Sequence, residues 1–142
     1  MDRKPVVMVA DDQEDLRWLY QHWLSEAGYH VRPVHDGAWA LALIPPDPPD
    51  LLLLDLQLPE VDGLEVCRQL RARDALQELP VLAVTSRTDA IVRDQLAAAG
   101  ADALLIKPFS RIELTSEVDR LLRLGGGDRS ASRLRAMVVE QL

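Results

Sequence analysis

Cysteine is almost absent from this chain, and long apolar runs are missing. The 142-residue sequence holds one cysteine, Cys67, which excludes an internal disulfide and a cysteine-rich zinc site. No apolar run approaches the ~20 residues that a membrane-spanning helix requires. Residues 1–5 show no secretory signal before the first strand-like run. We therefore expect a cytoplasmic protein that makes no contact with a membrane.

Basic residues are also in deficit. Sixteen lysines and arginines face 23 aspartates and glutamates, which gives a net charge of −7. Nucleic-acid binders carry basic patches that pair with phosphates, so this charge argues against direct nucleic-acid contact. The histidines, His22, His30 and His35, have no ligand-like spacing. The length and the hydrophobic fraction of 48% suit one globular domain with a real core.

Apolar, strand-like runs alternate with segments of helical period, which is the pattern of βαβ units around a parallel sheet. We predict strands at residues 6–10, 31–34, 51–54, 81–84 and 103–106, and helices at residues 16–27, 37–44, 64–71, 88–99 and 110–122. The predicted fold class is α/β, with a doubly wound, five-stranded parallel sheet. The last helix begins with a capping box, Ser110-x-x-Glu113, and is expected to bury Ile112, Val118, Leu121 and Leu122.

Three glycines divide the chain into two parts. Residues 1–124 form the predicted domain, and Gly125, Gly126 and Gly127 interrupt it. We predict that residues 125–142 are a glycine-rich linker and a short tail with helical potential. Its apolar residues Leu134, Val138 and Val139 would allow a homodimer contact.

Acidic residues stand at the ends of two predicted strands. Asp11 and Asp12 follow the first strand, and Asp55 follows the third. Like charges packed together repel, so a cation normally joins them. Thr85 ends the fourth apolar run and Lys107 ends the fifth. Carboxylates, a hydroxyl and an ammonium are the groups that phosphoryl transfer uses as metal ligand, nucleophile, oxygen donor and positive clamp.

These five residues should lie together. Right-handed crossovers place the carboxyl ends of parallel strands on one edge of the sheet. In the assumed strand order 2-1-3-4-5, ligands bind in the crevice between strands one and three. Taken singly, each residue has an ordinary explanation as a helix cap, a turn former, a strand residue or a surface charge. Their joint placement favours a site.

The motif set resembles that of the response-regulator receiver domain of two-component signalling, over residues 5–124. The residues that carry the resemblance are Asp11-Asp12, Asp55 with the following Leu56-Gln57-Leu58-Pro59, Asp62-Gly63, Thr85-Ser86, Gly100-Ala101-Asp102-Ala103 and Lys107-Pro108-Phe109. The resemblance implies a flavodoxin-like receiver fold. It also implies a signalling switch that is phosphorylated by a sensor histidine kinase or a phosphotransfer protein.

The resemblance implies a role for each site residue. Asp55 would accept the phosphoryl group and join the ligands of a Mg²⁺ ion. Asp12 would bind this ion directly and Asp11 through water, and the backbone carbonyl of Gln57 would be a further ligand.

Thr85 and Lys107 would contact the phosphoryl oxygens. The Lys107-Pro108 peptide would be cis, a form that only X-Pro bonds adopt at low cost. The chain would catalyse its own phosphorylation and slow dephosphorylation without being a turnover enzyme.

One position departs from the family. Receiver domains usually have Tyr or Phe three residues before the lysine, and this chain has Leu104. An aliphatic side chain cannot act as the rotating aromatic of the family. We therefore expect the signal to travel by another route.

Three alternatives compete with this interpretation. The first is an aspartate-nucleophile, Mg²⁺-dependent phosphatase, although such enzymes typically place both acids as D-x-D after the first strand. The second is a degenerate receiver that acts only as a binding module. The third, a nucleotide-binding domain, lacks its glycine motifs. We expect a free-standing regulator acting on a downstream output protein. The alternative is a receiver cut from a longer chain, whose missing output domain would then make any DNA contact.

Overall fold

A computed structural model of the chain describes residues 3–124. The predicted linker and tail, residues 125–142, lie outside the described residues. So do the predicted helix and dimer contact of that tail.

The centre of the fold is one five-stranded sheet in the order β2-β1-β3-β4-β5. Every pair of neighbouring strands is parallel. The strands are β1 (Val6–Ala10), β2 (His30–Val34), β3 (Leu51–Asp55), β4 (Val81–Thr85) and β5 (Ala103–Ile106). Each lies within a residue of its predicted position. The predicted fold class, a doubly wound parallel sheet of the flavodoxin-like receiver type, is confirmed.

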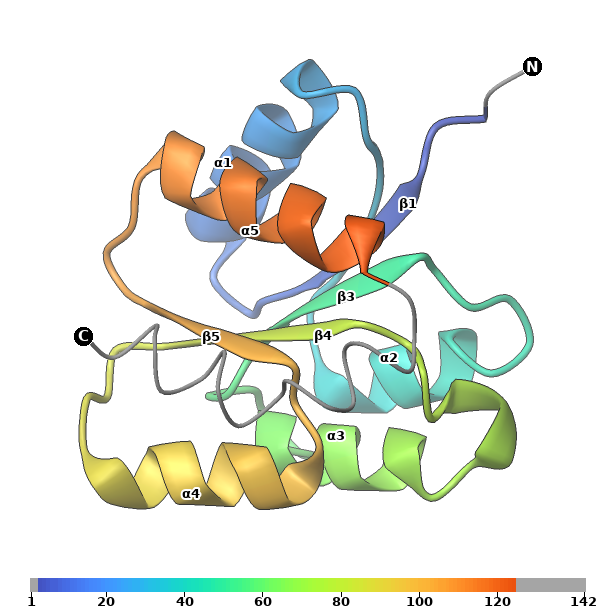
Figure 1. Cartoon of the computed structure of the whole chain (residues 1–142), viewed down its shortest axis with the longest axis vertical. Helices are drawn as coiled ribbons and strands as arrows, with labels where there is room; N and C mark the ends of the chain where they lie inside the picture. Colours follow the sequence, from blue (N-terminus) through green and yellow to red (C-terminus); the bar gives the residue numbers. More distant parts are fainter. Residues whose placement is uncertain (1–2, 125–142) are drawn as a thin grey trace.

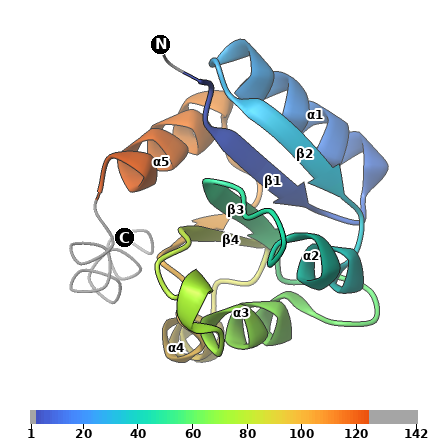
Figure 2. The ribbon, with the colours of Figure 1, turned by 90° about the vertical axis from the view of Figure 1, so that its right-hand side faces the viewer.

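Helices cover both faces of the sheet. Helices α1 (Glu14–Glu26) and α5 (Arg111–Arg123) pack on one face, and α2 (Gly37–Leu43), α3 (Gly63–Arg71) and α4 (Ala90–Ala99) pack on the other (Figures 1 and 2). A short 3₁₀ turn, η1 (Asp74–Leu76), follows α3. Helix α4 begins two residues later than predicted, because Asp89 caps it by accepting the N–H of Val92.

Burial follows from this layering. All five residues of β3 and of β4 are buried, because both faces of these central strands lie under helices. The edge strand β2 is largely accessible and contains Pro33. Proline has no N–H to offer a further strand, so it suits an edge position.

The prediction that Ile112 is buried is wrong. Its side chain is 65% exposed, whereas Leu114 is fully buried. Ser110 caps the helix, so Ile112 stands in the first turn, outside the stripe that faces the sheet. That stripe consists of Leu114, Val118 and Leu121, at the i, i+4, i+7 spacing of one helix face.

A buried ion pair joins several elements at the end of the sheet away from the predicted site. Asp102 is 2% exposed and accepts hydrogen bonds from the Val81 N–H at 2.8 Å and from Arg71 Nη2 at 3.0 Å. Arg71 also donates to the carbonyls of Gly100 and Leu76, at 3.0 Å and 2.8 Å. One arginine thus ties α3 to η1 and to the loop before β5.

Replacing Arg71 by alanine should lower the free energy of unfolding by about 3 kcal/mol, because a buried carboxylate loses its charged partner. Arg68→Ala is the matched control. Arg68 lies on the same helix and pairs with Glu65 in an exposed ion pair, so its loss should change stability by less than about 0.5 kcal/mol. Urea unfolding measures both changes. Equal small losses would show that the buried pair contributes little.

Candidate functional site

Three carboxylates converge at the carboxyl edge of the sheet. Asp11 and Asp12 follow β1, and Asp55 is the last residue of β3. Ala10 is paired with Leu54 across these neighbouring strands, so the acids stand side by side. One carboxylate oxygen from each lies within 4.8 Å of the others. Asp11 and Asp55 are buried, and Asp12 is exposed.

Lys107 reaches into this cluster from the end of β5. Its Nζ lies 2.9 Å from Asp55 Oδ2 and 3.5 Å from Asp11 Oδ2. The Lys107 N–H donates to the carbonyl of Thr85 at 2.8 Å, and the Lys107-Pro108 peptide is cis, as the resemblance implied. One ammonium cannot neutralise three carboxylates, so the site keeps an excess of negative charge.

Thr85 ends β4 and is 1% exposed. Asp55 is paired with Val84 in the sheet, so Thr85 lies next to the end of β3. Its hydroxyl oxygen accepts the N–H of Arg87 at 3.1 Å. The five predicted site residues thus all lie at one edge of the sheet, delivered by four strands.

Two backbone N–H groups orient the buried acids. The Gln13 N–H donates to Asp11 Oδ1 and the Gln57 N–H donates to Asp55 Oδ1, both at 2.9 Å. Each is a turn in which an aspartate accepts the N–H two residues later. The resemblance implies a role for Gln57 only through its carbonyl, and it implies none for Gln13. Each glutamine follows its aspartate by two positions, and this Asp-x-x spacing is the sequence signal that predicts the two N–H contacts.

The motif residues Asp62 and Gly63 shape the loop after Asp55. Asp62 caps α3 by accepting the Glu65 N–H at 3.0 Å. A Cβ on Gly63 would lie 2.5 Å from the Asp55 carbonyl oxygen. Glycine therefore allows α3 to begin directly against the site.

Burial raises the pKa of Asp11, and the negative charge of Asp55 adds to this, while the Gln13 N–H and Lys107 oppose it. Burial and the charges of Asp11, Asp55 and Asp15 likewise raise the pKa of Tyr20. The Tyr20 ring stacks on Phe109, with the ring centres 5.1 Å apart. The site therefore disfavours further negative charge while no cation is bound.

Asp11→Asn should stabilise the Mg²⁺-free protein by about 1 kcal/mol at pH 7, as changes that relieve strained functional sites do. A raised carboxyl pKa means that the folded state binds a proton more readily than the unfolded state. The gain from asparagine should therefore grow as pH rises through the raised pKa and shrink below it. Urea unfolding in a chelator from pH 4 to pH 8 measures this trend. A destabilised variant with no pH trend would contradict it.

The donor set fits Mg²⁺. This ion prefers oxygen ligands, keeps several waters and is usually held by one or two carboxylates. Asp11, Asp12 and Asp55 offer such oxygens with surplus negative charge.

Comparison with known proteins agrees with this arrangement. The family model described as the response regulator receiver domain matches residues 7–119. The chain belongs to the response regulator receiver domain family. Such domains act in two-component signalling, where they interact with histidine kinases and output domains. Among residues 3–124 of this receiver domain, no helix is long and apolar enough to cross a membrane.

The receiver domain has relatives of known sequence and structure. Response regulator MprA of Mycobacterium avium is 44% identical over 117 residues, which are 82% of this chain and 50% of that protein. The chain thus spans about half the length of the MprA proteins that it matches. The chemotaxis response regulator CheY4 of Vibrio cholerae has a TM-score of 0.80 at 28% identity, covering 84% of this chain and 99% of that one.

A further structural relative bears on the metal. The receiver domain of sensor histidine kinase PA1611 from Pseudomonas aeruginosa PAO1 has a TM-score of 0.79 at 28% identity, covering 84% of this chain and 98% of that one. That structure has a magnesium ion coordinated in the active site cleft.

Proposed function

We propose that this receiver domain takes a phosphoryl group from a sensor histidine kinase or a phosphotransfer protein onto Asp55. Phosphorylation then switches which partner the domain binds. The observation that carries the proposal is the buried Asp55 carboxylate, which lies between two further aspartates and the Lys107 ammonium. A carboxylate so placed is a nucleophile with its charge partners already in position.

The Asp55 carboxylate has a fixed orientation before transfer. The Gln57 N–H holds Oδ1, and Lys107 holds Oδ2. One of these oxygens attacks the phosphorus, a new O–P bond forms, and the P–N bond to the kinase histidine breaks. The imidazole leaves with the electron pair and takes a proton from water. Lys107 then neutralises charge on the phosphoryl oxygens, because its ammonium already lies at the attacked carboxylate.

Mg²⁺ would be held by Asp11, Asp12, Asp55 and the backbone carbonyl of Gln57. Bound there, it supplies positive charge that offsets the repulsion between the Asp55 carboxylate and the incoming phosphoryl group. The magnesium-bearing relative and the excess of carboxylates in this site support the assignment.

The output signal should begin at Thr85. If its hydroxyl turns toward a phosphoryl oxygen, it gives up the N–H of Arg87, and the segment before α4 must shift. Leu104 is fully buried and has no polar tip, so it cannot exchange a buried for an exposed position as the usual aromatic does. Ile91, which is 64% exposed on α4, lies on the surface that would change.

In this proposal the chain is a switch in the cytoplasm and not a turnover enzyme. It accepts one phosphoryl group and loses it slowly to water. The net charge of −7 leaves any DNA contact to another chain or to an output domain. A phosphatase would need a substrate pocket beside Asp55. Membership of the receiver family argues against the phosphatase alternative.

Phosphotransfer profiling tests the function. Histidine kinases of the source organism are autophosphorylated with labelled ATP and mixed with the chain for short times. One kinase should transfer its label to this chain well before the others do. If none transfers at any time, the chain does not act as a kinase-coupled switch.

A further inference from the structure

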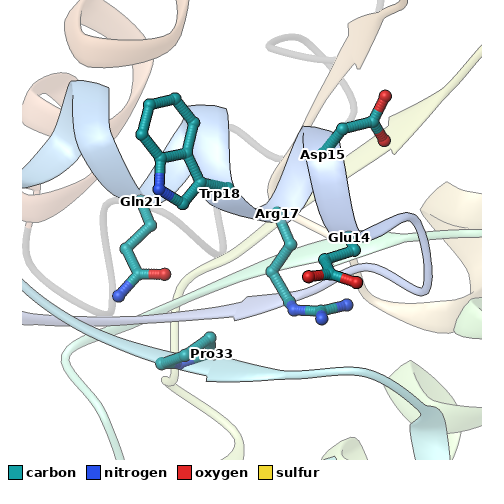
Figure 3. A pocket seen from close by; sticks show the side chains of 6 residues that line it. All are labelled: Glu14, Asp15, Arg17, Trp18, Gln21 and Pro33. Carbon is teal, nitrogen blue, oxygen red and sulfur yellow. The ribbon is translucent and has the colours of Figure 1, made fainter.

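Arg17 lies on α1 and is one of the residues that line a surface groove. The groove has a volume of about 740 Å³ and is lined by Glu14, Asp15, Arg17, Trp18, Gln21 and Pro33 (Figure 3). The Arg17 side chain extends from the helix toward the strand that carries Pro33. Its Nη1 donates a hydrogen bond of 2.8 Å to the backbone carbonyl of Asp11.

This carbonyl belongs to the peptide that joins Asp11 to Asp12. The Asp11 N–H donates to the Val34 carbonyl at 3.2 Å, so β2 holds the chain before Asp11 and Arg17 holds it after. A peptide group is planar, so fixing its oxygen also fixes the nitrogen of Asp12. Asp12 is exposed, and its carboxylate takes its direction from the backbone that carries it.

We propose that Arg17 is a positioning residue for the cation site, because it fixes the peptide from which Asp12 projects. The proposal rests on the proposed function only for the identity of the cation, Mg²⁺. The same guanidinium carries a positive charge close to the acids, and charge alone would repel a cation. Positioning and charge therefore predict opposite results when Arg17 is removed. The affinity for Mg²⁺ falls if Arg17 positions Asp12, and it rises if only the positive charge matters.

The experiment is calorimetric titration of Mg²⁺ into the full chain, with no phosphoryl donor present. Arg17→Ala should weaken binding about tenfold, the lower end of the effect of groups that orient metal ligands. Arg17→Lys keeps a charged donor and should recover part of the affinity. Arg17→Met keeps the apolar stem but has no donor, so it should weaken Mg²⁺ binding as Arg17→Ala does. It replaces the alanine variant in the experiment if that variant folds poorly.

Arg32→Ala is the matched control. Arg32 Nη1 donates to the backbone carbonyl of Asp47 at 2.8 Å, the same kind of bond at the same distance, but between β2 and the segment before β3. Its loss should leave the affinity for Mg²⁺ unchanged. Thermal unfolding should show similar small losses for Arg17→Ala and Arg32→Ala, which separates positioning from general stability.

Two outcomes would overturn the inference. Tighter Mg²⁺ binding by Arg17→Ala would show that only the charge matters. Unchanged binding, with a stability loss like that of Arg32→Ala, would show that the bond is merely structural. Because no phosphoryl donor is used, a failure of Asp55 to accept phosphate would refute the proposed function without affecting this test.

Discussion

Asp55→Asn should abolish uptake of a phosphoryl group from acetyl phosphate and Mg²⁺. An amide is a poor nucleophile, and the change removes the negative charge that pairs with the Lys107 ammonium. Loss of a nucleophile should slow labelling at least about a thousandfold. Intact-protein mass spectrometry at neutral pH, with and without acid treatment, follows the one acid-labile group expected on the wild type.

The control for this change is Asp62→Asn, in the same loop. Asp62 caps α3, and asparagine is an equally good cap, so the variant should fold and label like the wild type. Undiminished labelling of Asp55→Asn would place the acceptor elsewhere. Equal loss in both variants would instead indicate damage to the loop.

Asp12→Ala should weaken Mg²⁺ binding by more than about a hundredfold, beyond the range seen for groups that only orient ligands. Asp12 is the exposed member of the acidic cluster, so its carboxylate is the one most open to a hydrated ion. Asp15→Ala removes the same charge from the first turn of α1, outside the cluster, and should change the affinity little. Calorimetry measures both affinities. If the two variants lose the same affinity for Mg²⁺, Asp12 acts only through its general negative charge and not as a ligand.

The fold could be predicted from sequence because its determinants are local and periodic. Residues 51–54 and 81–84 are apolar without alternation, which indicates strands covered on both faces, and β3 and β4 are buried throughout. Glycine and proline marked the segment ends. The meeting of Asp11, Asp12 and Asp55 followed from the rule that parallel strands end on one edge.

Polar contacts made by side chains between elements could not be predicted in this way. The bond from Arg17 to the Asp11 carbonyl depends on the angle at which α1 leaves the sheet, which no short pattern encodes. The pairing of Arg71 with Asp102 joins residues 31 positions apart through tertiary packing. The prediction that Ile112 is buried failed because an apolar residue in the first turn of a helix resembles a member of the buried stripe even when it lies one position outside it.

The most direct test of the central claim is to locate the phosphoryl group chemically. The chain is treated with acetyl phosphate and Mg²⁺, then reduced with borohydride, which converts an aspartyl phosphate into homoserine, and its peptides are sequenced by mass spectrometry. The proposal predicts homoserine in place of Asp55, with Asp11 and Asp12 unchanged. Homoserine at Asp11 or Asp12, or labelled protein with Asp55 intact, would contradict it.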